Sequence, residues 1–259
     1  MNKTETIQEN KIKKENAGGV AVEKDYLSEN KNENNEFNLK IEEMANAGLQ
    51  FGHHVSKTYP KMSPYISGVK NTIHLIDLEK SVREFSKTLY FLKKLVREGK
   101  IILVVGTKIQ MKDLVRQFAE ELGFPYINER WLGGTITNFP IIKKRIEYFR
   151  DLENKREKGE LEKYTKKERA KFDKEIKDLE IKFGGIKNME SVPDAIFVLD
   201  VKKDELAVRE ARKKRIPVIG IVDTNINPEL VDYLIPANDD AISSVKYILE
   251  KIKEAIKKE

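Results

Sequence analysis

The sequence predicts an α/β protein in which a doubly wound, mostly parallel sheet carries an inserted antiparallel helical hairpin. Three observations lead to this fold class. Short uninterrupted apolar runs, typical of strands buried on both faces, alternate with longer segments of helical periodicity. A highly charged block in the middle of the chain has apolar residues only at helical spacing. The 259 residues are enough for one large domain with an appendage.

The beginning of the chain differs in composition from the rest. Residues 1–36 are rich in Lys, Glu and Asn and have no sustained period, so we expect a disordered or partly ordered leader, or an arm that orders on a partner. The α/β domain is expected to comprise residues 37–138 and 184–259, and the hairpin residues 139–183.

Order should begin near Phe37 with a short amphipathic helix that ends at Gly48 or Gly52. Residues 51–70 mix glycine, proline, lysine and tyrosine, so they cannot form one regular element. Basic and aromatic side chains on irregular backbone suit contacts with RNA phosphates and exposed bases, and a packed surface loop would have the same composition. Residues 73–76 are a candidate short strand.

The core strands and helices then alternate along the chain. Residues 101–105 form an apolar run closed by Gly106, which is typical of a parallel strand covered on both faces. The other candidate strands are residues 126–127, 195–200 and 217–223, with a weak edge strand at 233–235. Helical patterns occupy residues 77–99, 108–122, 202–215 and 240–257. This alternation predicts a Rossmann-like or flavodoxin-like sheet with helices on both faces.

The central charged block is predicted to form two paired helices. Their coiled-coil seams are Phe139, Ile142, Ile146 and Phe149 in the first helix and Phe172, Ile176, Leu179 and Phe183 in the second. Gly159 breaks the run, and Thr165 with Glu168 has the form of a capping box that would start the second helix. A hairpin with so narrow a seam should project from the domain as a contact arm, or else be an inert insertion. Its candidate contact residues are Lys143, Lys144, Arg145, Lys166, Lys167 and Arg169.

The charge distribution favours a polyanionic partner. The chain has 49 Lys and Arg against 43 Asp and Glu, and the first 38 residues are themselves slightly acidic, so the whole basic excess lies after them. Lys and Arg that meet phosphates release condensed counterions, and nucleic acid is the commonest cytosolic polyanion. The absence of cysteine excludes disulfides and thiolate chemistry. We expect no membrane span, because no apolar run approaches the roughly 20 residues that cross a bilayer, and no secretory signal, because the start MNKTETIQENKIKK lacks an apolar stretch.

Motifs of catalysis are incomplete. No GxGxxG follows a strand, no GxSxG is present, and Gly106-Thr107-Lys108 lacks the upstream glycine of a phosphate loop, so Lys108 is expected to cap a helix or face solvent. His53 with Asp200 and Asp223 at adjacent strand ends forms a candidate metal site. Asp223 would equally suit a strand-end turn.

The basic residues nevertheless form groups that suit phosphate contact. Lys108, Lys112 and Arg116 are expected on one helix face at four-residue spacing, and a second helix has a dense basic cluster. Solvated helix faces are the alternative interpretation. The candidate RNA-binding residues are Lys57, Lys61, Lys70, Lys108, Lys112, Arg116, Arg130, Arg209, Arg212, Lys213 and Arg215.

Six segments together resemble one family. They are FGHHVSKTYPKMSPYISGVKNTIHLIDLEK, VVGTK, RWLGGTITNF, FGGIKNMESVPDAIFVLD, IPVIGIVDTN and IPANDDAI, in this order and with the hairpin between the third and the fourth. They are similar to the family of the second ribosomal protein of the bacterial small (30S) subunit, and the resemblance extends from about Phe37 to the final helix. An Asn- and Lys-rich leader and the lack of an acidic tail depart from the family pattern without touching these motifs.

The resemblance implies a structural constituent of the 30S subunit and no enzyme. Such proteins bind 16S ribosomal RNA at the head–body junction, with both the globular domain and the hairpin, and lie near other ribosomal proteins, including the large mRNA-recruiting first protein. It further implies a cytoplasmic, ribosome-bound protein with no cofactor, membrane or small-molecule substrate. The motif of Arg130 and Trp131 is expected to be structural, with Trp131 packed where the hairpin joins the domain. A nucleotide-using enzyme and a non-ribosomal adaptor are the alternatives.

Overall fold

The computed structural model describes residues 37–257, and its helices and strands lie in one compact unit, Lys40–Glu259. The expected leader, residues 1–36, lies outside the described residues. A five-stranded sheet forms the centre of the unit, with the strand order β5-β4-β6-β7-β8 and every neighbouring pair parallel. The strands are β4 (Ile102–Val105), β5 (Tyr126–Ile127), β6 (Ala195–Val198), β7 (Val218–Val222) and β8 (Tyr233–Pro236). The Rossmann-like parallel sheet predicted from the apolar runs is therefore confirmed, with β8 at one edge.

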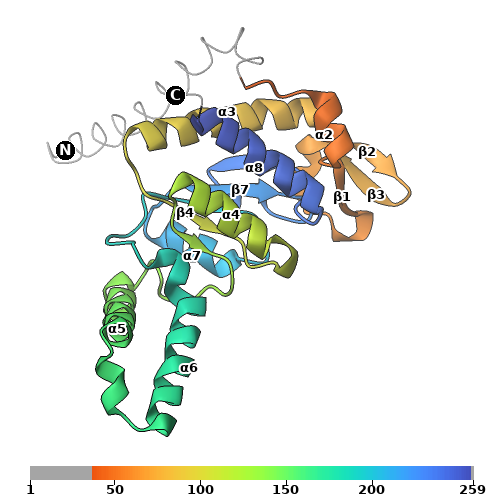
Figure 1. Cartoon of the computed structure of the whole chain (residues 1–259). Coiled ribbons are helices and arrows are strands. Elements are labelled where there is room, and N and C mark those ends of the chain that lie inside the picture. The colour runs from red at the N-terminus through yellow and green to blue at the C-terminus, as the bar shows by residue number, and fades with distance from the viewer. Residues whose placement is uncertain (1–36, 258–259) are drawn as a thin grey trace, which may run out of the picture. The chain divides into compact units, whose positions relative to one another are not determined.

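Helices cover both faces of this sheet (Figure 1). On one face α8 packs against α3 and α4, and the ring of Phe118 in α4 meets Phe197 of β6 edge-on at 6.3 Å. On the other face α7 shares a buried cluster with Leu103 and Val105 of β4, the residues that alternate with those facing α4. The helices are α2 (Ile41–Ala47), α3 (Leu78–Arg97), α4 (Lys112–Leu122), α7 (Glu205–Lys213) and α8 (Ile242–Lys257).

The helix ends follow local rules that the sequence predicts. Asp77 begins α3, because its carboxylate accepts the backbone N–H groups of Glu79 and Lys80 at 3.1 and 3.3 Å. Gly48 ends α2 in the left-handed conformation, with φ of 82°. One boundary was predicted wrongly. Lys108 lies outside α4, since a 3-10 turn (Ile109–Met111) precedes the helix, and Lys108 therefore does not share a helix face with Lys112 and Arg116.

A second, antiparallel sheet was not predicted. Its order is β1-β3-β2, with β1 at Phe51–His54, β2 at Ile66–Lys70 and β3 at Ile73–Ile76. Only β3 was expected, while the stretch between β1 and β2 contains two 3-10 turns, Val55–Lys57 and Pro60–Tyr65. Asn71 and Thr72, with φ of 49° and 64°, form the tight hairpin between β2 and β3, a turn that needs two left-handed residues.

Two helices lie between the strands β5 and β6, as the central charged block predicts. They are α5 (Phe139–Glu157) and α6 (Lys166–Phe183), which run side by side away from the sheet (Figure 1). Thr165 and Glu168 form the expected capping box, and the hydroxyl of Tyr148 donates to Glu175 across the pair at 3.1 Å. Coiled-coil packing of the pair stays a prediction. Within residues 37–257, no helix is both long and apolar enough to cross a membrane.

Candidate nucleic-acid interface

Lys108 lies at the carboxyl ends of the parallel strands, inside a group of carboxylates. Its ammonium is 2.7 Å from Asp200 Oδ2, 3.1 Å from Asp239 Oδ1 and 2.9 Å from Asp240 Oδ1, and it also donates to the backbone oxygen of Asp239 at 3.0 Å. Burial disfavours the charged amine, but the charge of Asp239 and the hydrogen bonds to Asp200 and Asp240 raise the pKa of Lys108 above its ordinary value. The expectation that Lys108 caps a helix or faces solvent is therefore wrong.

His53 joins the same group from β1. Its Nδ1 is 2.8 Å from Asp223 Oδ2, its Nε2 is 3.4 Å from Asp240 Oδ2, and its backbone N–H donates to the Thr224 hydroxyl at 2.9 Å. The hydrogen bond to Asp223 and the nearby charges of Asp239 and Asp240 raise the pKa of His53. These contacts fasten the small antiparallel sheet to the end of β7.

The sequence-based metal candidate is only partly assembled. His53 and Asp223 lie together, but Asp200 is bonded to Lys108, and Asp239 and Asp240 occupy the remaining places. One ligand atom from each of His53, Asp223, Asp239 and Asp240 lies within 4.8 Å of the others. Geometry alone would let this group hold a cation, yet the ammonium of Lys108 already supplies positive charge to it.

The stability of the fold should fall as the pH rises from about 5 to 8. Burial and the charge of Asp200 raise the pKa of Asp239 to about 7. The folded chain therefore holds this proton more tightly than the unfolded chain, and stability is lost as the pH rises toward the folded pKa. The free energy of unfolding should therefore fall between pH 5 and pH 8, and we expect Asp239→Asn to make this fall smaller by roughly 1–3 kcal/mol, measured by urea unfolding at the two pH values. Asp240→Asn, which removes an exposed carboxylate with a lowered pKa, should keep the slope. A wild-type slope in Asp239→Asn would contradict this assignment.

Glu210 anchors the root of the α5–α6 pair, and the sequence did not single it out. Its buried carboxylate accepts hydrogen bonds from five donors between Trp131 and Thr137. Oε1 accepts from the Trp131 indole at 3.2 Å and from the Gly134 N–H at 2.7 Å, and Oε2 accepts from the N–H groups of Ile136 and Thr137 and from the Thr137 hydroxyl at 3.0–3.1 Å. Burial raises the pKa of Glu210, but these hydrogen bonds outweigh it and leave the pKa lowered. The expected structural role of Trp131 is confirmed by its 7% exposure and its place in the core.

The predicted phosphate-binding residues of α4 and of the loop after β5 are close together. Lys112 is half-buried and paired with Glu129, Arg116 is exposed and paired with Glu120 at 2.9 Å, and Arg130 is exposed. Because Lys108 is directed into the carboxylates, it is separated from this group.

A second basic group lies on and after α7. Arg209 pairs with Glu205 at 2.7 Å, and Arg212 donates to the backbone oxygen of Glu229. Lys213 and Arg215 are exposed and form no ion pair with another described residue. Arg215 ends the helical segment in a left-handed conformation, with φ of 58°. This group offers cations at the surface whose carboxylate partners are few.

The remaining candidates are all exposed. In the region of the antiparallel sheet, Lys61 pairs with Glu229, while Lys57 and Lys70 make no ion pair within the described part of the chain. On the helical pair, Lys143 donates to the backbone oxygen of Glu190 at 3.2 Å. The other five candidates there, Lys144, Arg145, Lys166, Lys167 and Arg169, are exposed as well.

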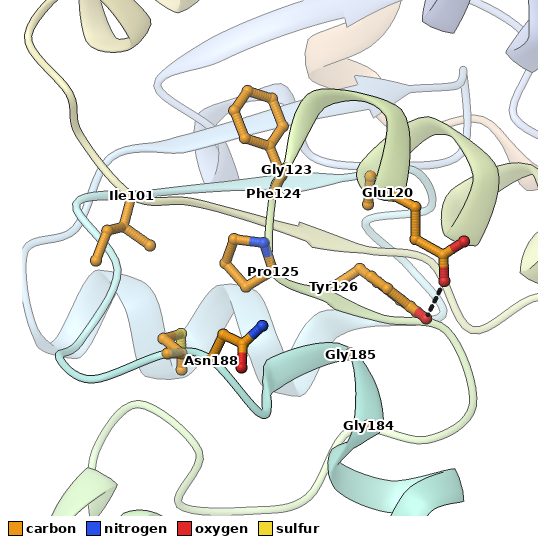
Figure 2. Close-up of a pocket in the computed structure, with 11 residues that line it drawn as sticks. Ile101, Glu120, Gly123, Phe124, Pro125, Tyr126, Gly184, Gly185 and Asn188 are labelled. Carbon is orange, nitrogen blue, oxygen red and sulfur yellow. Dashed lines mark hydrogen bonds between the residues drawn. The ribbon is translucent and has the colours of Figure 1, made fainter.

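Another pocket lies where β4 and β5 begin, beside Ile101 and Tyr126, and its lining differs from the basic groups described above (Figure 2). It measures about 470 Å³ and is lined by the turn from Gly123 to Tyr126 and by the segment after α6. The Tyr126 hydroxyl donates to Glu120 at 3.1 Å, and a side chain at Gly185 would collide with the Tyr126 backbone oxygen, because a Cβ there would be 2.2 Å away. Its lining contains a carboxylate and no cation, so it does not attract phosphate.

Comparisons with known proteins agree with the motif resemblance. The family model described as Ribosomal protein S2 matches residues 44–259. A curated relative, the small ribosomal subunit protein uS2 of Coprothermobacter proteolyticus, is 43% identical over 218 residues, which cover 84% of this chain and 81% of the relative. The match includes the parallel sheet, the helical pair and the carboxylate group around Lys108.

Proposed function

The chain belongs to the ribosomal protein S2 family, and from this premise we propose that it is a structural constituent of the small (30S) ribosomal subunit that binds 16S ribosomal RNA at the head–body junction. The family match over residues 44–259 carries this proposal, and a structural ribosomal role in translation follows from it directly. The protein acts without catalytic turnover, in the cytoplasm and bound to ribosomes.

The distribution of basic side chains supports RNA as the ligand. Exposed cations lie on α7, on the region of the antiparallel sheet and on both helices of the central pair. Several of them, such as Lys57, Lys70 and Lys213, have no carboxylate partner among the described residues and are available to phosphates. Contacts of this type set position and affinity and do not read base sequence. The protein therefore recognises the shape of folded RNA through many separate phosphate contacts.

The helical pair α5–α6 serves as a contact arm in this proposal. Its exposed lysines and arginines surround a narrow apolar seam, so most of its surface is charged and accessible. The arm reaches RNA and neighbouring small-subunit proteins, and the mRNA-recruiting first protein docks nearby. The five hydrogen bonds that Glu210 accepts, which we call the Glu210 clamp, fix the root of the arm to α7 and thereby set its direction.

The alternative of a nucleotide-using enzyme depends on free strand-end carboxylates. In the structure these groups are engaged, because Asp200 binds Lys108 and Asp223 binds His53. Two backbone amides in the segments after β4 and β6 are engaged as well. The N–H of Thr107 donates to Asp204 at 3.1 Å, and that of Lys203 donates to Asp200 at 2.7 Å. A phosphate loop needs such amides to cradle a terminal phosphate.

Co-sedimentation tests the proposal. The purified full-length protein should migrate with small ribosomal subunits in a sucrose gradient, and its affinity for small-subunit ribosomal RNA should fall steeply between 50 and 200 mM salt, by roughly 10³-fold if about six phosphates are contacted. Replacing Lys213 and Arg215 with Ala should weaken binding. Replacing Lys87 and Lys246 should not, because each of these exposed lysines is paired with a glutamate of its own helix, α3 or α8. A protein that stays at the top of the gradient would overturn the proposal.

A further inference from the structure

A pocket of about 510 Å³ lies at the carboxyl edge of the parallel sheet, where the chain changes direction. From β4 the chain passes to β5 on one side, and it later returns to β6 on the other side of β4. The segments that leave β4 and β6 lead to helices on opposite faces, α4 and α7, and so diverge. Such a switch point is where open α/β sheets have a crevice suited to ligands.

The lining of this switch-point pocket combines cations with exposed apolar side chains and with two carboxylates, Glu129 and Asp204, that are engaged within the protein. Arg130, Lys203 and Lys112 contribute the positive charges. Lys112 is paired with Glu129, but neither Arg130 nor Lys203 forms an ion pair or a side-chain hydrogen bond with another described residue. Ile109 and Leu206 also line it and are 85% and 48% exposed, so their apolar surfaces are accessible from the pocket. Two unpaired cations beside two uncovered apolar side chains suit a ligand with an anionic part and a flat apolar part.

We infer that the switch-point pocket holds one nucleotide of an RNA strand, with its phosphodiester on Arg130 and Lys203 and its base against Ile109 and Leu206. This inference rests on the proposed function and adds to it a defined subsite. Bases outside a duplex bind proteins through their faces, and their phosphates bind through Arg and Lys.

The occupied amides favour a strand of RNA over a free nucleotide. A terminal phosphate with two negative charges is usually held by several backbone N–H groups. Here the amides of Thr107 and Lys203 both donate to buried carboxylates, Asp204 and Asp200. The groups that remain for a phosphate are the side chains of Arg130 and Lys203, which suit the two non-bridging oxygens of a phosphodiester.

Filter binding to small-subunit ribosomal RNA tests this inference with the full-length protein. We expect Arg130→Ala/Lys203→Ala to weaken binding roughly tenfold and to make the slope of log affinity against log salt less steep by about two. Leu206→Glu, in the first turn of α7 where an acidic residue is compatible with the helix, should weaken binding by a similar factor, and Leu206→Gln by less. The control Lys87→Ala/Lys246→Ala changes the net charge equally and should bind as the wild type does.

The outcomes separate this inference from the proposed function. Failure of the wild type itself to bind the RNA would overturn both. Wild-type affinity in all the pocket variants would overturn the subsite and leave the proposed function standing. Calorimetry with AMP covers the other source of a nucleotide, and saturable AMP binding that Leu206→Glu abolishes, with RNA affinity unchanged, would also overturn the assignment to an RNA strand.

Discussion

Glu210→Ala should lower the free energy of unfolding by on the order of 4 kcal/mol, measured by urea denaturation at pH 7. The substitution removes the shared acceptor of five donors, four of them N–H groups of the segment between Trp131 and Thr137. A buried donor left without a partner costs roughly 1–3 kcal/mol, and Ile136 is fully buried, so its N–H has no route to water. The fluorescence of Trp131, the only tryptophan, reports directly on the same segment and should change as well.

Glu210→Gln separates the hydrogen bonds from the volume of the side chain. An amide keeps one acceptor oxygen but turns an NH₂ group toward donors, so at least one pair of N–H groups would face each other. We expect a loss of about 2–3 kcal/mol. Glu205→Gln, on the same helix but exposed and paired only with Arg209, should change stability by less than about 1 kcal/mol. If Glu210→Ala and Glu205→Gln were equally stable, the clamp would have no energetic importance.

The importance of Glu210 is hard to read from the sequence because it stands among charged residues. The run from Arg209 to Arg215 has the composition of a solvated helix face, and composition alone favours that interpretation. One signal points the other way: Glu210 comes three residues after Ala207 and directly precedes Ala211, which places it on the buried stripe of α7. A carboxylate on such a stripe must have partners, and the partners come from a loop more than 70 residues earlier.

Other parts of the fold were predictable for local reasons. A run such as residues 102–105 can only be a buried strand or a core helix, and Gly106 with the short length decides for the strand. The capping box at Thr165 depends on a spacing of three residues and is visible in the sequence alone. The antiparallel sheet was missed because β1 and β2 contain glycine, histidine and lysine with little alternation, and because β1 pairs with a strand about 20 residues away.

The carboxylate group around Lys108 was likewise only partly predictable from the sequence. Asp200 and Asp223 could be placed at strand ends, because parallel strands all finish at one edge of the sheet. Asp239 and Asp240 come a few residues after β8 and are 131 and 132 positions from Lys108, so no spacing rule links them to it. Direction also matters: a lysine after a strand can point to solvent, to a ligand or to its neighbours, and only the packed structure shows that Lys108 points to the carboxylates.

The group around Lys108 leads to the second large effect, since Lys108→Met should lower the free energy of unfolding by about 3–5 kcal/mol at pH 7. The ammonium contacts three carboxylates, and two of them, Asp200 and Asp239, are buried. Without it these two carboxylates would lie close together in a poorly hydrated site with no counter-ion, so one of them must take up a proton or stay unpaired, and the loss would exceed that of removing a surface lysine. Lys246→Met, at an exposed residue 3.9 Å from Glu250, is the matched control and should cost less than about 1 kcal/mol.

The charge explanation can be separated from loss of packing with a second substitution. If uncompensated carboxylates destabilise Lys108→Met, then adding Asp239→Asn to it should restore at least about 1 kcal/mol, because one buried anion disappears. Lowering the pH to 5 should restore stability in the single variant for the same reason, since Asp239 already has a pKa raised to about 7 in the wild type. A double variant as unstable as Lys108→Met at both pH values would mean that the lysine acts through its aliphatic stem. The strand ends would then be held together by packing, and the four contacts of the ammonium would contribute little to the fold.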